Sequence, residues 1–267
     1  IESDDKVKAF ICTQDLKDKE YTNSHNLIMV TKKGQVKKTS LDKYSKPRVN
    51  GVAAITIRED DELLGAQLTN GQSQIILAVK SGKLVRFEET KTRPMGRTAS
   101  GVRGITLKDE TDEVIGMVTV NDMESEILVV AENGYGKRTK LVEEDGVDVY
   151  RITNRGGKGV KTLNITEKTG ALIAINNVTD DDDLMIINKS GIAIRMAVDS
   201  LRVMGRATQG VRLIKVREDD SIAAVAKVMR EDDPELDESL QDEDSQNTPV
   251  DVSGAETTAE QTSTEEE

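Results

Sequence analysis

The sequence has few of the residues that catalytic and metal sites most often use. Its 267 residues include one histidine, His25, and one cysteine, Cys12. A histidine–cysteine metal cluster, a triad with a histidine base and an intrachain disulfide are therefore excluded. The acidic run 180–183 lacks the spaced ligands and the glycine of a calcium loop, so we interpret it as a turn. We assign no catalytic and no metal-binding residue, and we expect Cys12, with its apolar neighbours, to be a buried thiol.

Long apolar runs and aromatic residues are also scarce. No stretch approaches the roughly 18 apolar residues of a membrane-spanning helix, and the charged first residues do not resemble a signal peptide. We expect a cytoplasmic protein without a membrane partner. Tryptophan is absent, and phenylalanine and tyrosine together number six. Proteins that bind single-stranded nucleic acid stack bases on aromatic side chains, so this composition argues against that function.

What the sequence does contain is an internal repeat. The segment Arg93–Ile105 recurs as Arg202–Ile214 with three arginines in register. Two glycines return at intervals of about 50 residues, a period typical of propellers and arrays. The first occurs at Gly34, Gly82, Gly134 and Gly191, and the second at Gly51, Gly101, Gly159 and Gly210. The chain therefore contains four copies of the repeat.

Each copy reads as four short strands. In the second copy these are 63–68, 75–79, 84–87 and 102–107, rich in Val, Ile and Leu and bounded by turn residues. The pattern predicts an all-β, propeller-like disc in which the four strands of one copy form one blade. An extra first strand at 222–228 would complete a neighbouring sheet, so we expect strand exchange between blades. Another first strand is predicted at 7–12, and we infer that earlier blades are missing from this sequence.

Composition divides the chain at residue 230. Residues 231–267 hold 15 acidic side chains and no basic one, and we expect a disordered acidic tail. The whole chain has 37 basic and 49 acidic residues, a net charge of −12. Residues 1–230 alone hold all 37 basic and 34 acidic residues, so that part is mildly basic. The first part could then bind a polyanion, although the whole chain is acidic.

The basic residues of 1–230 fall at equivalent places in the repeats. In the segments that join third and fourth strands, the residues predicted to bind the polyanion are Arg48, Arg93, Arg97, Arg103, Arg155, Lys158, Arg202, Arg206 and Arg212. Lys46, Lys91, Arg151 and Lys161 lie in the same segments. On or beside the third strands, the residues predicted to bind the polyanion are Lys37, Lys38, Arg86, Lys137, Arg138 and Arg195. Because blades are related by rotation, we expect these cations to line one rim. Such a track suits the backbone of double-stranded DNA bent around the protein.

Five short stretches of the sequence resemble those of a known family. They are Val36–Thr39, Leu84–Phe87, Met95–Arg97, Gly101–Ile105 and Asn133–Thr139, the last reading Asn-Gly-Tyr-Gly-Lys-Arg-Thr. Together they resemble the C-terminal domain of the bacterial gyrase A protein, part of a type IIA DNA topoisomerase, over about residues 1–230. The resemblance implies a β-pinwheel that wraps DNA, so that the ATP-dependent DNA gyrase holoenzyme introduces negative supercoils. It also implies a nucleoid-associated A2B2 complex, in which the rest of a homodimeric A subunit joins the B subunit. ATP and Mg²⁺ would act elsewhere in that holoenzyme, and we expect no cofactor in this fragment.

One family motif is present only in part. Arg155, Gly156, Gly157, Lys158 and Gly159 match the last five positions of the family's seven-residue box, whereas Thr153 and Asn154 replace its glutamine and first basic residue. The paired glycines would let a phosphate approach backbone amides.

Other interpretations remain open. The chain also fits the A-type subunit of topoisomerase IV, and a more distant alternative is a protein-docking propeller without nucleic acid. The polar insertion 14–26 has no assigned role. The tail either competes with DNA for the basic rim or only increases solubility.

Overall fold

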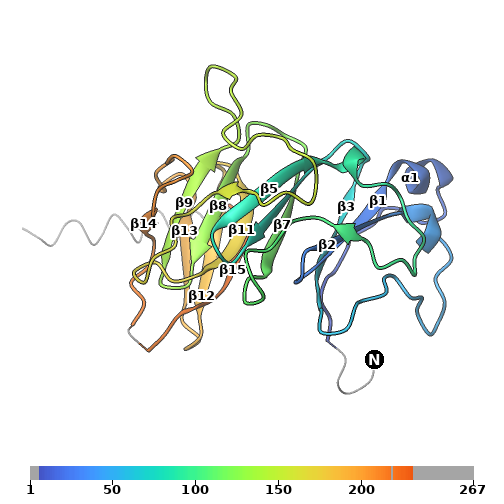
Figure 1. The fold of residues 1–267 in the computed structure, drawn as a ribbon, viewed down its shortest axis with the longest axis horizontal. Coiled ribbons are helices and arrows are strands. Elements are labelled where there is room, and N and C mark those ends of the chain that lie inside the picture. The colour runs from blue at the N-terminus through green and yellow to red at the C-terminus, as the bar shows by residue number, and fades with distance from the viewer. Residues whose placement is uncertain (1–5, 218, 231–267) are drawn as a thin grey trace, which may run out of the picture. The chain divides into compact units, whose positions relative to one another are not determined.

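A β-hairpin that occurs four times is the basic unit of the fold (Figure 1). The computed structural model describes residues 6–217 and 219–230. Its hairpins are β1 (Asn26–Thr31) with β2 (Gln35–Ser40), β4 (Gln74–Val79) with β5 (Lys83–Glu88), β8 (Glu126–Ala131) with β9 (Tyr135–Lys140), and β12 (Asp182–Asn188) with β13 (Ala193–Ala197). In each turn a glycine adopts a positive φ, as Gly82 does at 80°, which a tight turn requires.

Strands from the following repeat extend each hairpin into a sheet. A long strand pairs with the first hairpin strand: β3 (Leu63–Thr69) with β1, β7 (Val114–Val120) with β4, β11 (Leu172–Val178) with β8, and β15 (Ile222–Met229) with β12. A short edge strand pairs with the second hairpin strand: β6 (Val102–Arg103) with β2, β10 (Val160–Lys161) with β5, and β14 (Val211–Arg212) with β9. We number the resulting sheets 1 to 4 in chain order. Within the described residues, sheet 4 has no short edge strand on β13.

The predicted all-β class and the predicted strand exchange are confirmed, but the composition of a blade is different. We expected the four strands of one repeat to form one sheet. Instead, each of sheets 1 to 3 combines the hairpin of one repeat with the long strand and the short edge strand of the next, and the hairpin of sheet 4 is joined by the long strand β15. Exchange therefore occurs in every sheet and not only at the end of the array.

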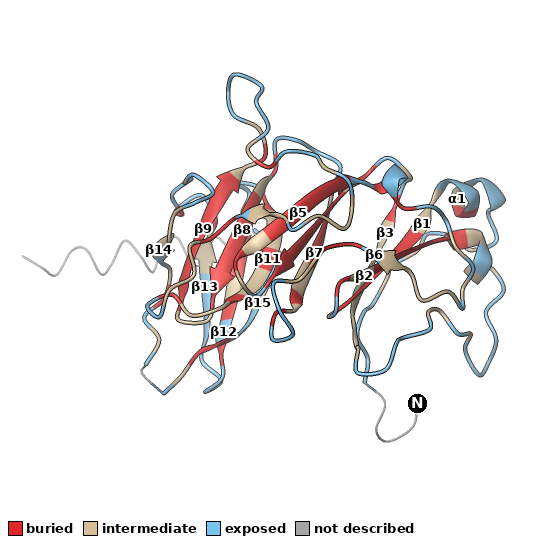
Figure 2. Ribbon diagram, in the orientation of Figure 1, coloured by how far each residue is buried: buried red, intermediate tan, exposed pale blue. Residues whose placement is uncertain are grey.

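Apolar residues of the hairpins hold consecutive sheets together. One cluster joins Ile28 and Val30 of sheet 1 to Ile75 and Leu77 of sheet 2. Equivalent clusters join sheet 2 to sheet 3 and sheet 3 to sheet 4. Figure 2 shows β5, β8 and β9 largely buried, whereas many residues of the connecting loops are exposed. Burial on both faces explains the nearly continuous apolar runs of the first hairpin strands, such as β4 and β8.

Polar contacts lock each repeat to the hairpin turn of the preceding one. Asp112 accepts hydrogen bonds from the backbone N–H of Ser81 at 3.0 Å and from its hydroxyl at 2.8 Å. Asp61 accepts from the N–H of Lys33 at 2.9 Å, and Asp220 accepts from the Ser190 hydroxyl at 2.8 Å. An aspartate of the following repeat thus caps three of the four turns.

The N-terminal part departs from the prediction. Residues 7–12 form no strand, Phe10 is 91% exposed, and Cys12 is exposed and not the buried thiol that we expected. In the other repeats this long strand pairs with a hairpin of the preceding repeat, and no such hairpin precedes residue 7 in this sequence. No strand follows Gly51 for the same reason.

Short helices occupy the remaining connections. The insertion 14–26 contains α1 (Lys19–Ser24), capped by the side chain of Asp18, and the 3-10 helices η1 (Leu41–Tyr44) and η2 (Glu89–Lys91) follow β2 and β5. No helix in the described part of the chain is long and apolar enough to cross a membrane. The predicted tail, 231–267, lies outside the described residues.

Candidate nucleic-acid interface

Three basic loops lie along the second strands of the first three hairpins in the same way. We define them as residues 93–97, 151–155 and 202–206. Each forms a parallel bridge to a cationic position of the strand beneath it, through Pro94 to Lys38, Ile152 to Arg86 and Val203 to Arg138. The next loop residue then donates its N–H to the carbonyl of the same strand residue, at 2.7, 2.9 and 2.9 Å. Identical backbone pairing gives the three loops one orientation relative to their sheets.

Because of this pairing, cations recur at three structurally equivalent positions. They are Arg93, Arg151 and Arg202 before the bridge, Arg97, Arg155 and Arg206 at the end of the loop, and Arg103, Lys161 and Arg212 on the short edge strands. Arg97 and Arg155 are half-buried and the other seven are exposed. None of the nine pairs with a carboxylate of the described residues. The nine cations form what we call the basic edge.

The cations beneath the loops are not on the surface. Lys37, Lys38, Arg86, Lys137 and Arg138 are all buried, with exposed fractions from 0 to 8%, so the expectation that they line an exposed track is wrong. The physical reason is the exchanged loop, which covers the strand that carries them.

Two of the buried lysines, Lys37 and Lys137, bind loop carbonyls. The Lys37 ammonium donates to the carbonyls of Ala54 and Arg97, and that of Lys137 donates to the carbonyl of Gly205. Burial, with a smaller contribution from a nearby arginine in each case, lowers the pKa of both lysines from 10.5 to about 8. These lysines hold the basic loops in place from below.

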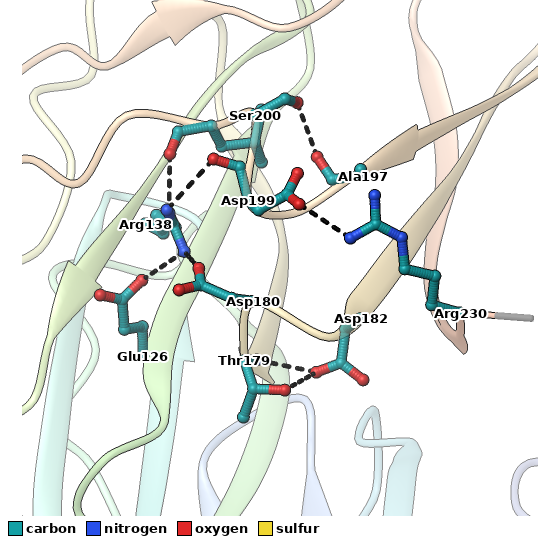
Figure 3. Close-up of polar contacts among 10 residues, drawn as sticks. Glu126, Arg138, Thr179, Asp180, Asp182, Ala197, Asp199, Ser200 and Arg230 are labelled. Carbon is teal, nitrogen blue, oxygen red and sulfur yellow. Dashed lines mark hydrogen bonds and ion pairs between the residues drawn. The ribbon is translucent and has the colours of Figure 1, made fainter. Parts of the chain in front are cut away.

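Arg86 and Arg138 also hold the covering segments in place, through a larger number of hydrogen bonds and ion pairs. Arg86 donates to the Gln74 side chain at 2.6 Å, the Tyr150 carbonyl at 2.9 Å and the Asp148 carboxylate at 2.9 Å. Arg138 donates to the Leu201 carbonyl at 2.7 Å and pairs with Glu126 at 3.2 Å and with Asp180 (Figure 3). Burial is tolerated because each guanidinium is paired and hydrogen-bonded. Lys38 donates to the Glu89 carbonyl at 3.1 Å in the same manner.

The remaining predicted contacts have mixed surroundings. Arg195 is equivalent to Arg138 but is exposed, and its Nε donates to Asp183 at 2.7 Å. Arg48 is exposed in a segment without regular structure that does not lie along a described strand. The register that we expected over four copies therefore holds over three.

The box-like segment lines a hollow of about 460 Å³ beside β5, together with Arg151 and Asn154. Lys158 is exposed on it, whereas Arg155 donates to the carbonyls of Lys91 at 3.1 Å and Arg103 at 3.2 Å. The Gly156 N–H donates to the Gly104 carbonyl at 2.6 Å, so this amide is not available to a phosphate as we expected. At Gly159 a Cβ would lie 2.5 Å from the Leu84 carbonyl oxygen, and φ is +71°, so glycine is required for the edge strand to form.

Sequence reasoning missed a group of cations outside the repeat pattern. Lys168, Lys215 and Arg217 line a second hollow with Arg212 and Tyr135. Lys168 and Lys215 have no cation at the equivalent positions of the other copies, so no periodic signal indicated them, whereas Arg217 corresponds to Lys108 in the second copy.

Comparisons with known proteins agree with this architecture. The family model described as the DNA gyrase C-terminal domain, beta-propeller, matches residues 25–70, 74–121, 125–179 and 182–229. These four matches correspond to the four hairpins, each with the long strand of the next repeat.

Curated proteins similar to this chain include the A subunits of DNA gyrase from two staphylococci. The chain is 43% identical to the gyrase A protein of Staphylococcus aureus (strain NCTC 8325 / PS 47) over 242 residues, which is 90% of this chain and 26% of the relative. It is 44% identical to that of Staphylococcus epidermidis (strain ATCC 12228 / FDA PCI 1200) over 234 residues, 87% of this chain and 25% of the relative. The chain thus spans about a quarter of the length of these relatives.

Solved structures share the fold at lower identity. A DNA gyrase A C-terminal domain superposes with a TM-score of 0.67 and 23% identity, covering 78% of this chain and 67% of the other. A C-terminal domain of DNA topoisomerase IV superposes with a TM-score of 0.71 and 23% identity, covering 83% and 67%. Since the family model matches well over half of the residues, the chain belongs to the family of DNA gyrase C-terminal domains with the beta-propeller fold.

Proposed function

We propose that this chain bends duplex DNA along its basic edge and serves as the DNA-wrapping part of the gyrase A protein. The observation that supports this most strongly is the equivalence of the nine cations on sheets 1 to 3. Exposed cations without carboxylate partners neutralise phosphates and release condensed counterions, which favours binding to any duplex sequence. Recognition through backbone charge leaves sequence preference to the bendability of the DNA.

The structure suggests how binding becomes bending. Each basic loop is fixed to the strand beneath it by backbone hydrogen bonds and by a buried cation, so loop positions change little when DNA binds. A rigid series of cations makes the DNA follow the protein, because preorganised groups lose little entropy on binding. The energy of the added phosphate contacts then offsets the cost of bending the duplex.

In the wider proposal the chain acts inside a holoenzyme. Wrapping presents a DNA crossing of one hand to the strand-passage machinery, and an ATP-dependent A2B2 complex with the B subunit then introduces negative supercoils. ATP and Mg²⁺ would bind elsewhere in that complex. A cytoplasmic, nucleoid-associated location follows from this role. Support comes from the identity of 43% to the gyrase A protein of Staphylococcus aureus.

A topology assay tests the proposal. A nicked plasmid is bound to the protein and ligated, and the linking number of the product is measured. We expect a shift of one sign that grows with protein concentration. The variant R93A/R97A/R202A/R206A should lose the shift, while K33A/K80A/K108A/K189A, with the same charge change at exposed sites off the basic edge, should retain it. An unchanged linking number with the natural sequence would contradict wrapping.

The alternative, a role in topoisomerase IV, has one observation in its favour, the similarity to the topoisomerase IV C-terminal domain. The identity of 43% to the gyrase A protein of Staphylococcus aureus supports gyrase. Weak or absent writhe in the same assay, with duplex binding retained, would favour topoisomerase IV. No retention of duplex at low salt would favour a protein-docking platform.

A further inference from the structure

Tyr135, the first residue of β9, organises a group of cations beside the basic edge. Its ring lies under two of them: the Lys168 ammonium and the Arg212 guanidinium are each 5.4 Å from the ring centroid. Arg212 also donates from Nη2 to the Tyr135 hydroxyl at 2.9 Å. Contact with the ring face restricts two otherwise flexible cationic side chains, so part of the entropy cost of binding an anion is already met.

These residues line a hollow of about 360 Å³. Four of its lining residues, Lys168, Arg212, Lys215 and Arg217, are exposed cations, and none pairs with a carboxylate of the described residues. Among the described residues, the carboxylate of Asp220 also lines it, but its oxygens accept hydrogen bonds from the hydroxyl and the N–H of Ser190. The hollow is therefore strongly cationic and open to solvent.

The same place in the other sheets is built differently. The positions equivalent to Tyr135 are Gln35, Lys83 and Ile192. Beside the turn of the first hairpin, the corresponding hollow is lined mainly by carboxylates, among them Asp60, Glu62 and Glu110. A cationic hollow at this position is thus a property of sheet 3 and not a consequence of the fold.

We propose that the Tyr135 hollow binds phosphate groups of duplex DNA and extends the basic edge at sheet 3. The inference rests on the proposed DNA-binding function. Arg212 connects the two surfaces, because its backbone lies in the short edge strand β14 and its side chain lies on Tyr135. A duplex that follows the basic edge to Arg212 would then meet Lys168, Lys215 and Arg217. The ring, covered by two cations, is not offered for base stacking, which favours backbone over base contact.

The test measures affinity for a linear duplex as a function of salt with the full chain. We expect K168A/K215A to weaken binding and to reduce the slope of log affinity against log salt by about 1 to 2, since each lost phosphate contact contributes about 0.9. The matched control K33A/K108A removes two exposed lysines near the acidic hollow and should leave the slope unchanged. Both lysines of the test pair are exposed, so the fold should be retained.

The variants Y135F and Y135L probe the ring itself. Y135F keeps the cation–ring contacts and loses the hydroxyl, so it should bind nearly as tightly as the natural sequence. Y135L removes both and should approach the affinity of K168A/K215A. Circular dichroism and thermal unfolding of each variant separate loss of the hollow from loss of the fold, because Tyr135 is largely buried.

The outcomes distinguish the two proposals. If R93A/R97A/R202A/R206A weakens binding while K168A/K215A behaves like K33A/K108A, the hollow proposal is wrong and the basic edge stands. If neither set changes binding, the proposed function fails as well. If K168A/K215A binds DNA more tightly, the hollow is occupied by acidic residues of the chain, and the phosphate assignment is overturned.

Discussion

Buried cations are the feature at the scale of single residues that most changes the interpretation of this sequence. Lys38, Arg86 and Arg138 occupy one equivalent position on three strands, and each is bound to carbonyl and carboxylate oxygens that include atoms of neighbouring segments. Truncating such a residue leaves buried acceptors without a donor, which costs more than the bond itself contributes. These cations hold the loops of the basic edge without forming part of it.

Burial lowers the pKa of Lys37, Lys38 and Lys137, which predicts a pH dependence of stability. Folding lowers the pKa of Lys37 and of Lys137 from 10.5 to about 8. Between these values the unfolded chain holds protons that the folded chain has released, so the free energy of unfolding should rise as pH increases from about 8 toward 10. Each of the single variants K37M and K137M should flatten this rise, as measured by urea unfolding across the pH series.

Two choices keep that measurement specific. K33M, at an exposed lysine, serves as the control and should follow the natural sequence. The series stops below pH 10, because burial raises the pKa of Tyr150 and its titration acts in the opposite direction. Identical slopes for all variants would contradict the role that we assign to Lys37 and Lys137.

At the scale of elements, the aspartate caps explain how one repeat fixes the turn of another. Asp112 binds the N–H and hydroxyl of Ser81 and the N–H of Lys108, which ties the hairpin turn to the following connection. We expect D112A to lower the free energy of unfolding by about 1 to 3 kcal/mol, the cost of leaving such donors unsatisfied. Urea denaturation with a constant m-value would measure it.

A matched control for this prediction is Asp122. Its carboxylate accepts from the N–H of Glu124 within its own exposed turn, so D122A removes a local bond without any link between repeats. Equal losses for D112A and D122A would show that capping across repeats has no special importance.

Elements were predicted well where the signal was local and poorly where it depended on a partner. Hairpin strands such as 75–79 and the glycine turns follow from apolar runs and positive φ, and the structure has β4 at Gln74–Val79. Residues 7–12 have the same apolar character but no hairpin to pair with, and they form no strand. Composition within one segment cannot reveal which segment will cover it.

The candidate site shows the same division. Arg93 and Arg202 lie in exposed loops, where charge patterning applies directly. Arg86 lies between Val85 and Phe87, both buried, and its apolar neighbours were a signal of burial that charge alone concealed. Tyr135 and Lys168 meet only through tertiary packing, which spacing in the sequence does not encode.

At the scale of the whole described unit, stability is shared between neighbouring sheets and should differ along the chain. Sheets 1 to 3 each have a short edge strand from the following repeat, whereas β13 has none among the residues described. Ile192 and Ile194, beside and within β13, are 47% and 38% exposed. Unpaired edges open more readily than paired ones, so β13 should be the least protected of the second hairpin strands.

Native-state hydrogen exchange of the full chain tests this order. We expect amides of β13 to exchange faster than those of β2, β5 and β9 under the same conditions. Addition of duplex DNA should slow exchange in the basic loops of sheets 1 to 3 more than in β13. Equal protection of β13 and β9 would contradict the prediction.

The sheets are offset from the sequence repeats, and this offset determines which deletions and duplications of a repeat the fold can tolerate. The hairpins of sheets 1 to 3 take both flanking strands from the next copy. If one copy is deleted, the hairpin before it can therefore pair with the flanking strands of the copy after it. Recombination between equivalent points of two copies can therefore shorten or lengthen the array without leaving an interior hairpin bare. Only a truncation at the end of an array leaves a hairpin without its flanking strands. Engineered arrays therefore need capping segments at their ends.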